Sequence, residues 1–261
     1  MKIAVSGKGG AGKTTLAALA AAELVRRGVR VTAIDADPNP TLGPCLVISE
    51  TPTPLLEMSE EIEERVDSGV IRLNPRVDDL VGKIAVGGDG LQLIVAGGPA
   101  RGGAGCACPQ SVLLRQLLEH VVVGLEEAVI IDLEAGLEHL GRRTAHAADA
   151  LIVVVDPTNA SVETAQRIAR LAADIDLRRV VLVANRIVDP TDVDFITERL
   201  PGFELIGEIP YSHELLVAER DRRPLMDVQG PAAAAVAQML DVLAASAATS
   251  AAEVTPEEVT T

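Results

Sequence analysis

The stretch GKGGAGKTT, residues 7–15, follows the apolar run Ile3–Val5 at the start of the chain and is the strongest indication of its fold. It satisfies the phosphate-loop pattern G-x-x-x-x-G-K-[ST] from Gly7 to Thr14. A loop without bulky side chains can turn its N–H groups onto phosphate oxygens, and a following helix adds its positive end. Lys13 stands where it can neutralise these oxygens. The sequence therefore predicts a phosphate-binding loop between a strand and a helix.

The same pattern predicts which residues bind the Mg²⁺ ion and the phosphates of a nucleotide. The Thr14 hydroxyl is expected to reach a Mg²⁺ ion that accompanies ATP or ADP. The backbone and side chains expected to surround the nucleotide phosphates are those of Gly9, Gly10, Ala11, Gly12, Lys13, Thr14 and Thr15.

Short apolar runs alternate with helical patterns along the chain. Several runs consist almost entirely of Val, Ile and Leu, as expected of strands that are buried on both faces. The pattern predicts an α/β fold with a mostly parallel central sheet of about seven strands and helices on both faces. Strands are expected at 2–6, 29–35, 91–96, 128–132, 150–156, 180–185 and 204–209. Helices are expected at 14–27, 56–66, 110–123, 161–173 and 192–200.

The chain reads as one ATPase domain over residues 1–245. Residues 246–261 contain no basic residue and no periodicity, and we expect a disordered tail there. No apolar stretch is long enough for a membrane span, and the chain passes directly from Lys2 into a strand, without space for a signal peptide. We therefore expect a cytoplasmic protein.

Composition narrows the classes of partner. The formal net charge is −15, which disfavours nonspecific nucleic-acid binding and an anionic membrane surface, so we expect neither as a partner. The chain has one Tyr, two Phe and no Trp, so a nucleotide base is not expected to be held mainly by aromatic stacking.

Two acidic residues follow predicted strands. Asp132 ends the run VIID, which is the usual place for a carboxylate that holds a Mg²⁺-bound water in phosphate-loop enzymes. Asp37 lies in AIDADPNP after the second strand, whereas Asp35 ends that strand and is interpreted as structural. Asn185 ends VLVAN, and its amide can donate and accept hydrogen bonds at once, as the edge of adenine requires. The alternative is an asparagine that simply ends a strand.

The phosphate loop resembles the deviant Walker A signature K-G-G-x-G-K-T-T. That family contains the nitrogenase iron protein, the ParA and MinD ATPases and metal-delivery ATPases. The resemblance implies that Lys8 crosses a homodimer interface and contacts the partner's nucleotide, although a solvated surface lysine is the simpler alternative. It implies that Asp37 orients the attacking water, that Asn185 in VLVANR reads the adenine, and that the backbone after Pro210 wraps the base. Glu134 departs from the family pattern, in which a small or neutral residue is usual at this position. A carboxylate beside the γ-phosphate would be repelled, so either Glu134 points away or this switch works differently.

Cys106 and Cys108 lie in the glycine-rich segment GAGCACP. Thiolates two residues apart can both bind one ion, and a closed zinc site prefers four ligands, so a two-fold dimer would complete the site. The alternative is a pair of small loop residues. Thiolate ligands do not discriminate Zn²⁺ from Ni²⁺. Cys45, beside Pro44, is interpreted as a packing residue.

Together with the cysteine pair, the segments DADPN, LNP at 73–75, DLEAGLEHL and IPY resemble the CooC-type maturation ATPases of carbon monoxide dehydrogenase. The resemblance extends to about residue 240. It implies an ATP-hydrolysing homodimer that inserts nickel into carbon monoxide dehydrogenase or acetyl-CoA synthase.

Two other functions remain open. A ParA- or MinD-like positioning ATPase would need a basic face or a basic C-terminal helix, and no Lys or Arg follows Arg223. An iron–sulfur electron donor like the nitrogenase iron protein would take its cysteines from two separate segments rather than from Cys-x-Cys.

Overall fold

The computed structural model describes residues 1–46, 48, 50, 52–58, 64, 77, 79–88, 90–97, 108–124, 127–137, 140, 142–177 and 179–252. Within them, one sheet has the strand order β3-β4-β2-β5-β1-β6-β7-β8. All neighbouring strands are parallel except the pair β3 and β4. The strands are β1 (Lys2–Gly7), β2 (Val31–Asp35), β3 (Val86–Gly87), β4 (Leu91–Val95), β5 (Ala128–Asp132), β6 (Ala150–Val155), β7 (Val180–Ile187) and β8 (Glu204–Pro210).

The predicted α/β phosphate-loop fold is confirmed, and a strand lies at each of the seven predicted places. The strand that the sequence did not predict is β3, a two-residue antiparallel edge strand. Its length is too short for the alternation that marks a strand in a sequence.

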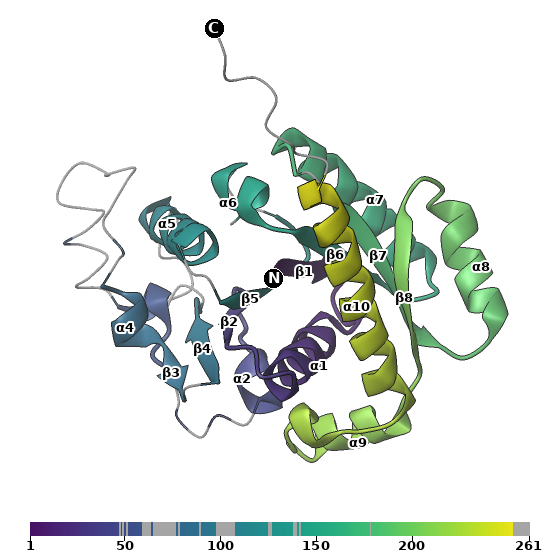
Figure 1. The fold of residues 1–261 in the computed structure, drawn as a ribbon, viewed down its shortest axis with the longest axis horizontal. Coiled ribbons are helices and arrows are strands. Elements are labelled where there is room, and N and C mark those ends of the chain that lie inside the picture. The colour runs from purple at the N-terminus through teal and green to yellow at the C-terminus, as the bar shows by residue number, and fades with distance from the viewer. Residues whose placement is uncertain are drawn as a thin grey trace, which may run out of the picture.

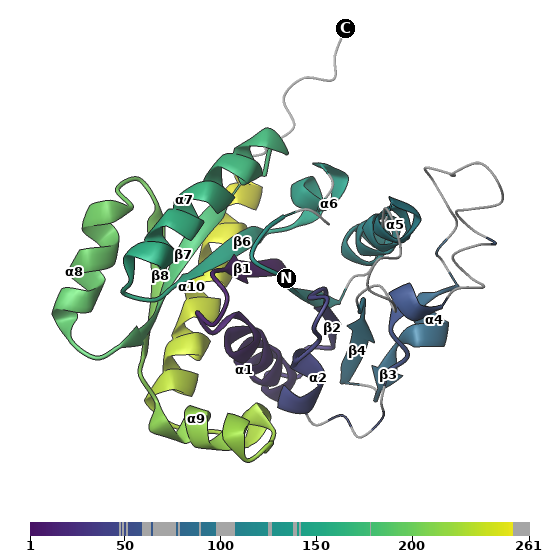
Figure 2. The ribbon, with the colours of Figure 1, turned by 180° about the vertical axis from the view of Figure 1, so that it is seen from behind.

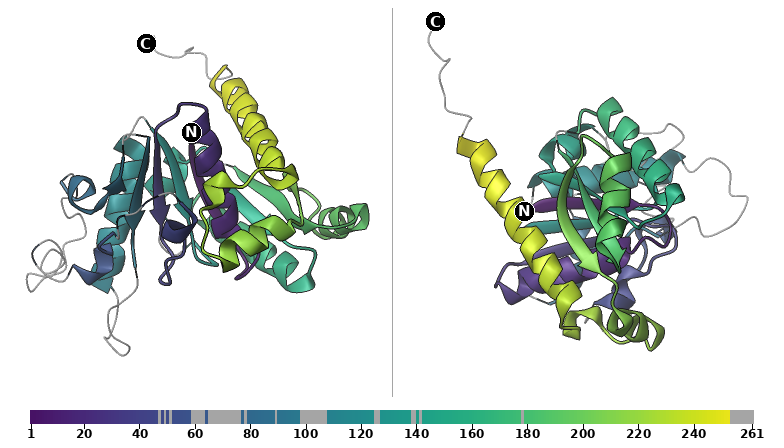
Figure 3. Two further views of the ribbon diagram at one scale, coloured as in Figure 1. Left: turned by 90° about the horizontal axis from the view of Figure 1, so that it is seen from below. Right: turned by 90° about the vertical axis from the view of Figure 1, so that its right-hand side faces the viewer.

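Helices cover both faces of the sheet, as Figures 1 and 2 show from opposite sides and Figure 3 from the edges. Helices α1 and α10 lie on one face, and α5, α6, α7 and α8 lie on the other. The helices are α1 (Lys13–Arg26), α2 (Leu42–Cys45), α4 (Val81–Ile84), α5 (Cys108–Gly124), α6 (Arg142–Ala147), α7 (Asn159–Asp174), α8 (Pro190–Arg199), α9 (His213–Arg220) and α10 (Pro231–Ala252). Single 3₁₀ turns span Leu55–Glu57 and Leu225–Asp227.

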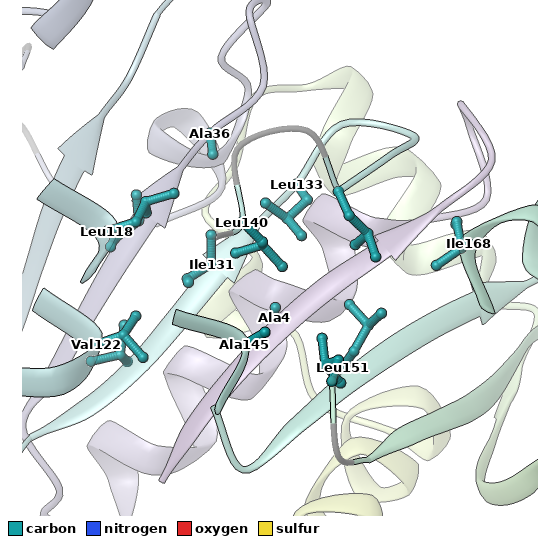
Figure 4. Close-up of a cluster of buried hydrophobic side chains, with 14 of the residues drawn as sticks. Ala4, Ala36, Leu118, Val122, Ile131, Leu133, Leu140, Ala145, Leu151 and Ile168 are labelled. Atoms are coloured by element: carbon teal, nitrogen blue, oxygen red, sulfur yellow. The ribbon is translucent and has the colours of Figure 1, made fainter. Parts of the chain in front are cut away.

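Two apolar cores result from the alternation of side chains along the strands. In β1, Ala4 packs into the core beneath α5, α6 and α7, whereas Ile3 and Val5 pack beneath α1 and α10. Figure 4 shows the first of these cores, in which Leu118, Ile131, Leu151 and Ile168 and their neighbours come together from helices and strands. The central strands are thus fixed from both sides, and their carboxyl ends form a rigid edge.

The C-terminal boundary differs from the prediction. Helix α10 continues to Ala252, so the tail expected from residue 246 begins inside a helix. The Ser246 hydroxyl donates to the Val242 carbonyl and accepts from Arg179, which ties this turn to the domain. The segment is rich in alanine, the strongest helix former, and composition alone did not reveal this. Residues 253–261 lie outside the described residues, as does most of the helix expected at 56–66. Among the described helices, none is long and apolar enough to cross a membrane.

Candidate nucleotide site

A cavity of about 580 Å³ opens at the carboxyl ends of the strands, where parallel sheets usually bind ligands. The β1–α1 loop, the β2–α2 loop, the segment after β5 and the end of α9 form its walls. Its lining residues are Gly9, Gly10, Gly12, Lys13, Thr14, Thr15, Asp37, Asn39, Pro40, Thr41, Pro44, Cys45, Glu134, Ala135, Arg186, Glu219, Arg222 and Arg223. The structure therefore gathers most of the predicted phosphate-binding residues and Asp37 around one cavity.

The phosphate loop has the backbone that its glycines permit. Gly12 adopts φ +101°, and a Cβ there would clash with the amide nitrogen of Asn185. Helix α1 starts directly afterwards at Lys13, which is 8% exposed. Because no side chain of the first turn accepts from the N–H groups at the start of α1, the loop suits an anionic ligand. Lys8 is half-buried and is not among the residues that line the cavity of its own chain.

The predicted magnesium residues contact each other. The Thr14 hydroxyl donates to Oδ2 of Asp132 at 2.6 Å and lies 3.3 Å from the Thr41 hydroxyl. Asp132 is 1% exposed, and within the described residues its Oδ1 has no hydrogen-bond partner. Burial raises the pKa of Asp132 to about 7, against the opposing effects of the Thr14 hydrogen bond and Lys13. A buried carboxylate oxygen without a partner and a neighbouring hydroxyl fit Mg²⁺, which prefers oxygen ligands and would be held here by Thr14 and by waters on Asp132.

The two aspartates after β2 have different surroundings. Asp35 is fully buried, and its carboxylate accepts from the backbone N–H groups of Asp37, Thr41 and Leu42 at 3.2, 2.8 and 2.8 Å. It therefore shapes the β2–α2 loop, in agreement with the structural role that we expected. The Asp37 carboxylate is half-buried, accepts from the Asn39 N–H at 2.8 Å and lines the cavity. Asp37 thus remains available to a ligand.

A second cavity of about 310 Å³ adjoins the first and shares Gly12, Thr15, Arg186 and Glu219 with it. The predicted base residues Asn185 and Pro210 both line it. The Asn185 side chain is 9% exposed and donates to the Ala11 carbonyl at 2.7 Å. The remaining lining residues are Tyr211, Ser212, Leu215 and Leu216. The two cavities together have the arrangement expected for a nucleotide with its phosphates on the loop and its base between β7 and α9.

Several cavity residues were not identified from the sequence. Arg186 and Arg222 line the first cavity and adopt left-handed backbone conformations, with φ of 61° and 53°. Arg223 and Glu219 join them from the end of α9, a helix that the sequence did not predict. Non-glycine residues in this region are uncommon and cluster at functional sites. Arg186 directly follows Asn185, and that position offered the clearest sequence indication.

Cys45 also lines the cavity, and its thiol donates to the Thr41 carbonyl at 3.4 Å. Burial raises the pKa of this thiol to about 11, and the nearby carboxylate of Glu219 acts in the same direction. Cys106 lies outside the described residues. Cys108 is the first residue of α5, and its side chain is not among those that the structure describes. Over the described part of the chain, no group of three or more His, Cys, Asp or Glu residues could hold a metal ion. The predicted thiolate site stays a prediction.

Comparisons with known proteins show the family of this chain. Residues 2–225 match the model of the CobQ/CobB/MinD/ParA nucleotide binding domain. An uncharacterized ATP-binding protein of Methanocaldococcus jannaschii is 38% identical over 234 residues, which cover 86% of this chain and 91% of that protein. The carbon monoxide dehydrogenase accessory protein CooC of Rhodospirillum rubrum is also 38% identical, over 84% of this chain and 87% of its own length.

The solved structures that resemble this chain support the fold. The MinD cell division protein of Aquifex aeolicus superposes with a TM-score of 0.64 at 23% identity, over 99% of each chain. Given the family match over most of the chain and the phosphate loop that lines the cavity, the chain belongs to the CobQ/CobB/MinD/ParA family of nucleotide-binding ATPases.

Proposed function

We propose that this ATPase is a CooC-type metallochaperone: a homodimer that hydrolyses ATP to support nickel insertion into carbon monoxide dehydrogenase or acetyl-CoA synthase. The observation that carries the proposal is the 38% identity to CooC over 84% of this chain. The Cys-x-Cys pair at residues 106 and 108 supports the same function, since thiolates bind the metals that such a protein would carry.

In this proposal the residues around the first cavity act on ATP and Mg²⁺. Lys13 offsets the charge of the phosphates, Thr14 and Asp132 hold the Mg²⁺ ion, and Asp37 orients the attacking water. Asn185 and the segment after Pro210 hold the base. Because Lys8 does not line its own cavity, it is available to the nucleotide of a second copy, where a cation would stabilise the charge of the transition state.

In this proposal the Zn²⁺ or Ni²⁺ ion is the cargo of the dimer, and Cys106 and Cys108 of both copies bind it. Each chain supplies two thiolates, whereas a closed zinc site uses four at about 2.3 Å. ATP and metal then both favour the dimer, and their effects on each other must be reciprocal. ATP should tighten metal binding, and hydrolysis should weaken it and release the ion near a client enzyme.

Metal titration with and without ATP and Mg²⁺ tests this function. We expect one Zn²⁺ or Ni²⁺ ion per dimer, tighter binding with ATP, and loss of the ion in the Cys106→Ser, Cys108→Ser double variant. Cys45→Ser is the matched control and should retain the metal, because that thiol lies at the nucleotide cavity. One ion per chain, or metal retained by the double variant, would contradict the shared site.

A further inference from the structure

The segment that follows β5 is fastened to the strand that carries the phosphate loop. The Leu133 N–H donates to the Val5 carbonyl at 2.9 Å, which extends the pairing of β5 and β1 by one residue. The fully buried Ser6 hydroxyl lies 3.1 Å from the Glu134 carbonyl and 3.3 Å from the Gly136 carbonyl, and it can donate to either. The Gly136 N–H also donates to the Glu134 carbonyl, at 2.7 Å. The backbone of Glu134 therefore has a defined position next to the phosphate loop.

A third contact comes from helix α7. The Arg167 guanidinium, on the exposed face of α7, donates to the Ala135 carbonyl at 2.9 Å. A charged donor makes a stronger hydrogen bond than a neutral one. The Ala135 carbonyl thus accepts from Arg167 of α7, and the carbonyls of Glu134 and Gly136 on either side of it share the single Ser6 hydroxyl of β1. These contacts hold a segment that is itself neither helix nor strand.

What they position is a carboxylate at the cavity. The Glu134 side chain is exposed and lines the same cavity as Asp37 and Lys13. Among the described residues, no hydrogen bond or ion pair holds the Glu134 carboxylate itself. Lys13 and the cavity arginines supply positive charge that offsets repulsion between this carboxylate and a bound triphosphate.

We propose that Glu134 is a second catalytic carboxylate for ATP hydrolysis and that Arg167 is its positioning residue. A water molecule has two protons, and two carboxylates that accept both of them leave an oxygen lone pair directed at the γ-phosphorus. Asp37 and Glu134 are the two acceptors. The water oxygen bonds to the γ-phosphorus, the bond from phosphorus to the bridging oxygen of ADP breaks, and a carboxylate passes the water proton to the phosphate formed.

The inference rests on the proposed role of Asp37 but not on the metal cargo. It predicts that Glu134→Ala lowers kcat at least about tenfold while the KM for ATP and the Kd for ADP change less than about twofold. Glu134→Gln retains an accepting oxygen and should lose less. Glu163→Gln, an exposed glutamate on α7 away from the cavity lining, is the control and should keep full activity.

A double-variant cycle tests the positioning by Arg167. Arg167→Ala should lower kcat several-fold, Arg167→Lys should recover part of the loss, and Arg170→Ala, an exposed arginine on the same helix, should be neutral. In the Glu134→Ala background, Arg167→Ala should have no further effect. An equal loss in both backgrounds would overturn the positioning role. Unchanged kcat in Glu134→Ala, with activity still lost in Asp37→Asn, would overturn the second carboxylate and leave the role of Asp37 intact.

Discussion

The hydroxyl of Thr14 in α1 donates to the buried carboxylate of Asp132 in β5 at 2.6 Å, and both groups are proposed to hold the Mg²⁺ ion. Thr14 lies in the first turn of α1, which follows β1, and Asp132 lies at the end of β5. Strands β1 and β5 are neighbours in the sheet, and this brings the two residues together. Thr14 thus satisfies Oδ2 of Asp132 and leaves Oδ1 without a partner among the described residues, and binding of a Mg²⁺–nucleotide complex would replace this hydrogen bond by metal coordination.

The first prediction concerns pH and stability. The Asp132 carboxyl ionises near 4 in an unfolded chain but only at about 7 in the fold, because burial disfavours its charged form. The folded state therefore binds more protons between these values, and the free energy of unfolding should fall as pH rises from 4 to 7. Asp132→Asn lacks this dependence and should be more stable than the wild type at pH 8, by on the order of 2–4 kcal/mol.

Calorimetric melting at pH 5, 6, 7 and 8, with EDTA and without nucleotide, measures the difference. The gap between Asp132→Asn and wild type should widen with pH and level off above 7. Asp194→Asn, which changes an exposed carboxylate, should follow the wild-type profile. Parallel profiles for wild type and Asp132→Asn would show that Asp132 is ionised throughout this range.

The second prediction concerns Lys8. Lys8→Ala should abolish hydrolysis and leave ATP binding by a single chain largely intact, because Lys13, Thr14 and Asp132 form the site within the chain. Wild-type hydrolysis per molecule should rise with protein concentration as dimers form. Phosphate release and equilibrium ATP binding are measured for both proteins, with Lys83→Ala, a surface lysine paired with Asp79, as control. Normal hydrolysis by Lys8→Ala would rule out a role in the partner's site.

The third prediction concerns Asp37. Asp37→Asn should bind ATP and Mg²⁺ but hydrolyse slowly, since the water loses an orienting carboxylate while the phosphate loop is unchanged. The dimer should then persist during size-exclusion chromatography with ATP, whereas the wild-type dimer should dissociate as ATP is consumed. A monomer with bound ATP would count against this role.

The fourth prediction concerns the Cys45 thiol. With a pKa of about 11, roughly one thiol in a thousand is ionised at pH 8, and the thiolate is the nucleophile. Alkylation of Cys45 by iodoacetamide should therefore be at least about a hundredfold slower in the folded protein than in urea. Peptide mass spectrometry separates Cys45 from the other two cysteines. Equal rates in the folded and unfolded protein would mean that the thiol is neither buried nor raised in pKa.

The sequence predicted the parts of the fold that depend on local patterns. Seven strands were found because runs such as Ala150–Val155 are buried on both faces and therefore uniformly apolar. Helix α10 (Pro231–Ala252) was not among the predicted helices, and its alanine-rich end was interpreted as part of a disordered tail. Helix α9 was not predicted, because its segment was interpreted only as a wrap around the base.

In the candidate site, too, the sequence indicated the residues that local patterns mark and missed the others. Motif spacing identified the phosphate loop, strand ends pointed to Asp132 and Asn185, and the family resemblance pointed to Asp37. The contact between Arg167 and Ala135 joins segments that are 32 residues apart through an exposed side chain, and no sequence pattern marks such a pair. Arg222 and Arg223 were missed for a related reason, since they reach the cavity only because α9 ends beside it.

The hydrogen bond from Asn185 to the Ala11 carbonyl has a consequence for the choice between purines. An asparagine amide can be turned over, which exchanges its donor and its acceptor. The Ala11 oxygen accepts from one N–H and so fixes the orientation of the amide, leaving the second N–H and the oxygen for the base. Adenine offers an acceptor beside an amino donor and matches this pair, whereas the corresponding edge of guanine offers two acceptors and would face the amide oxygen with like charge. In the proposed binding mode, a main-chain atom of the phosphate loop would thereby favour ATP over GTP.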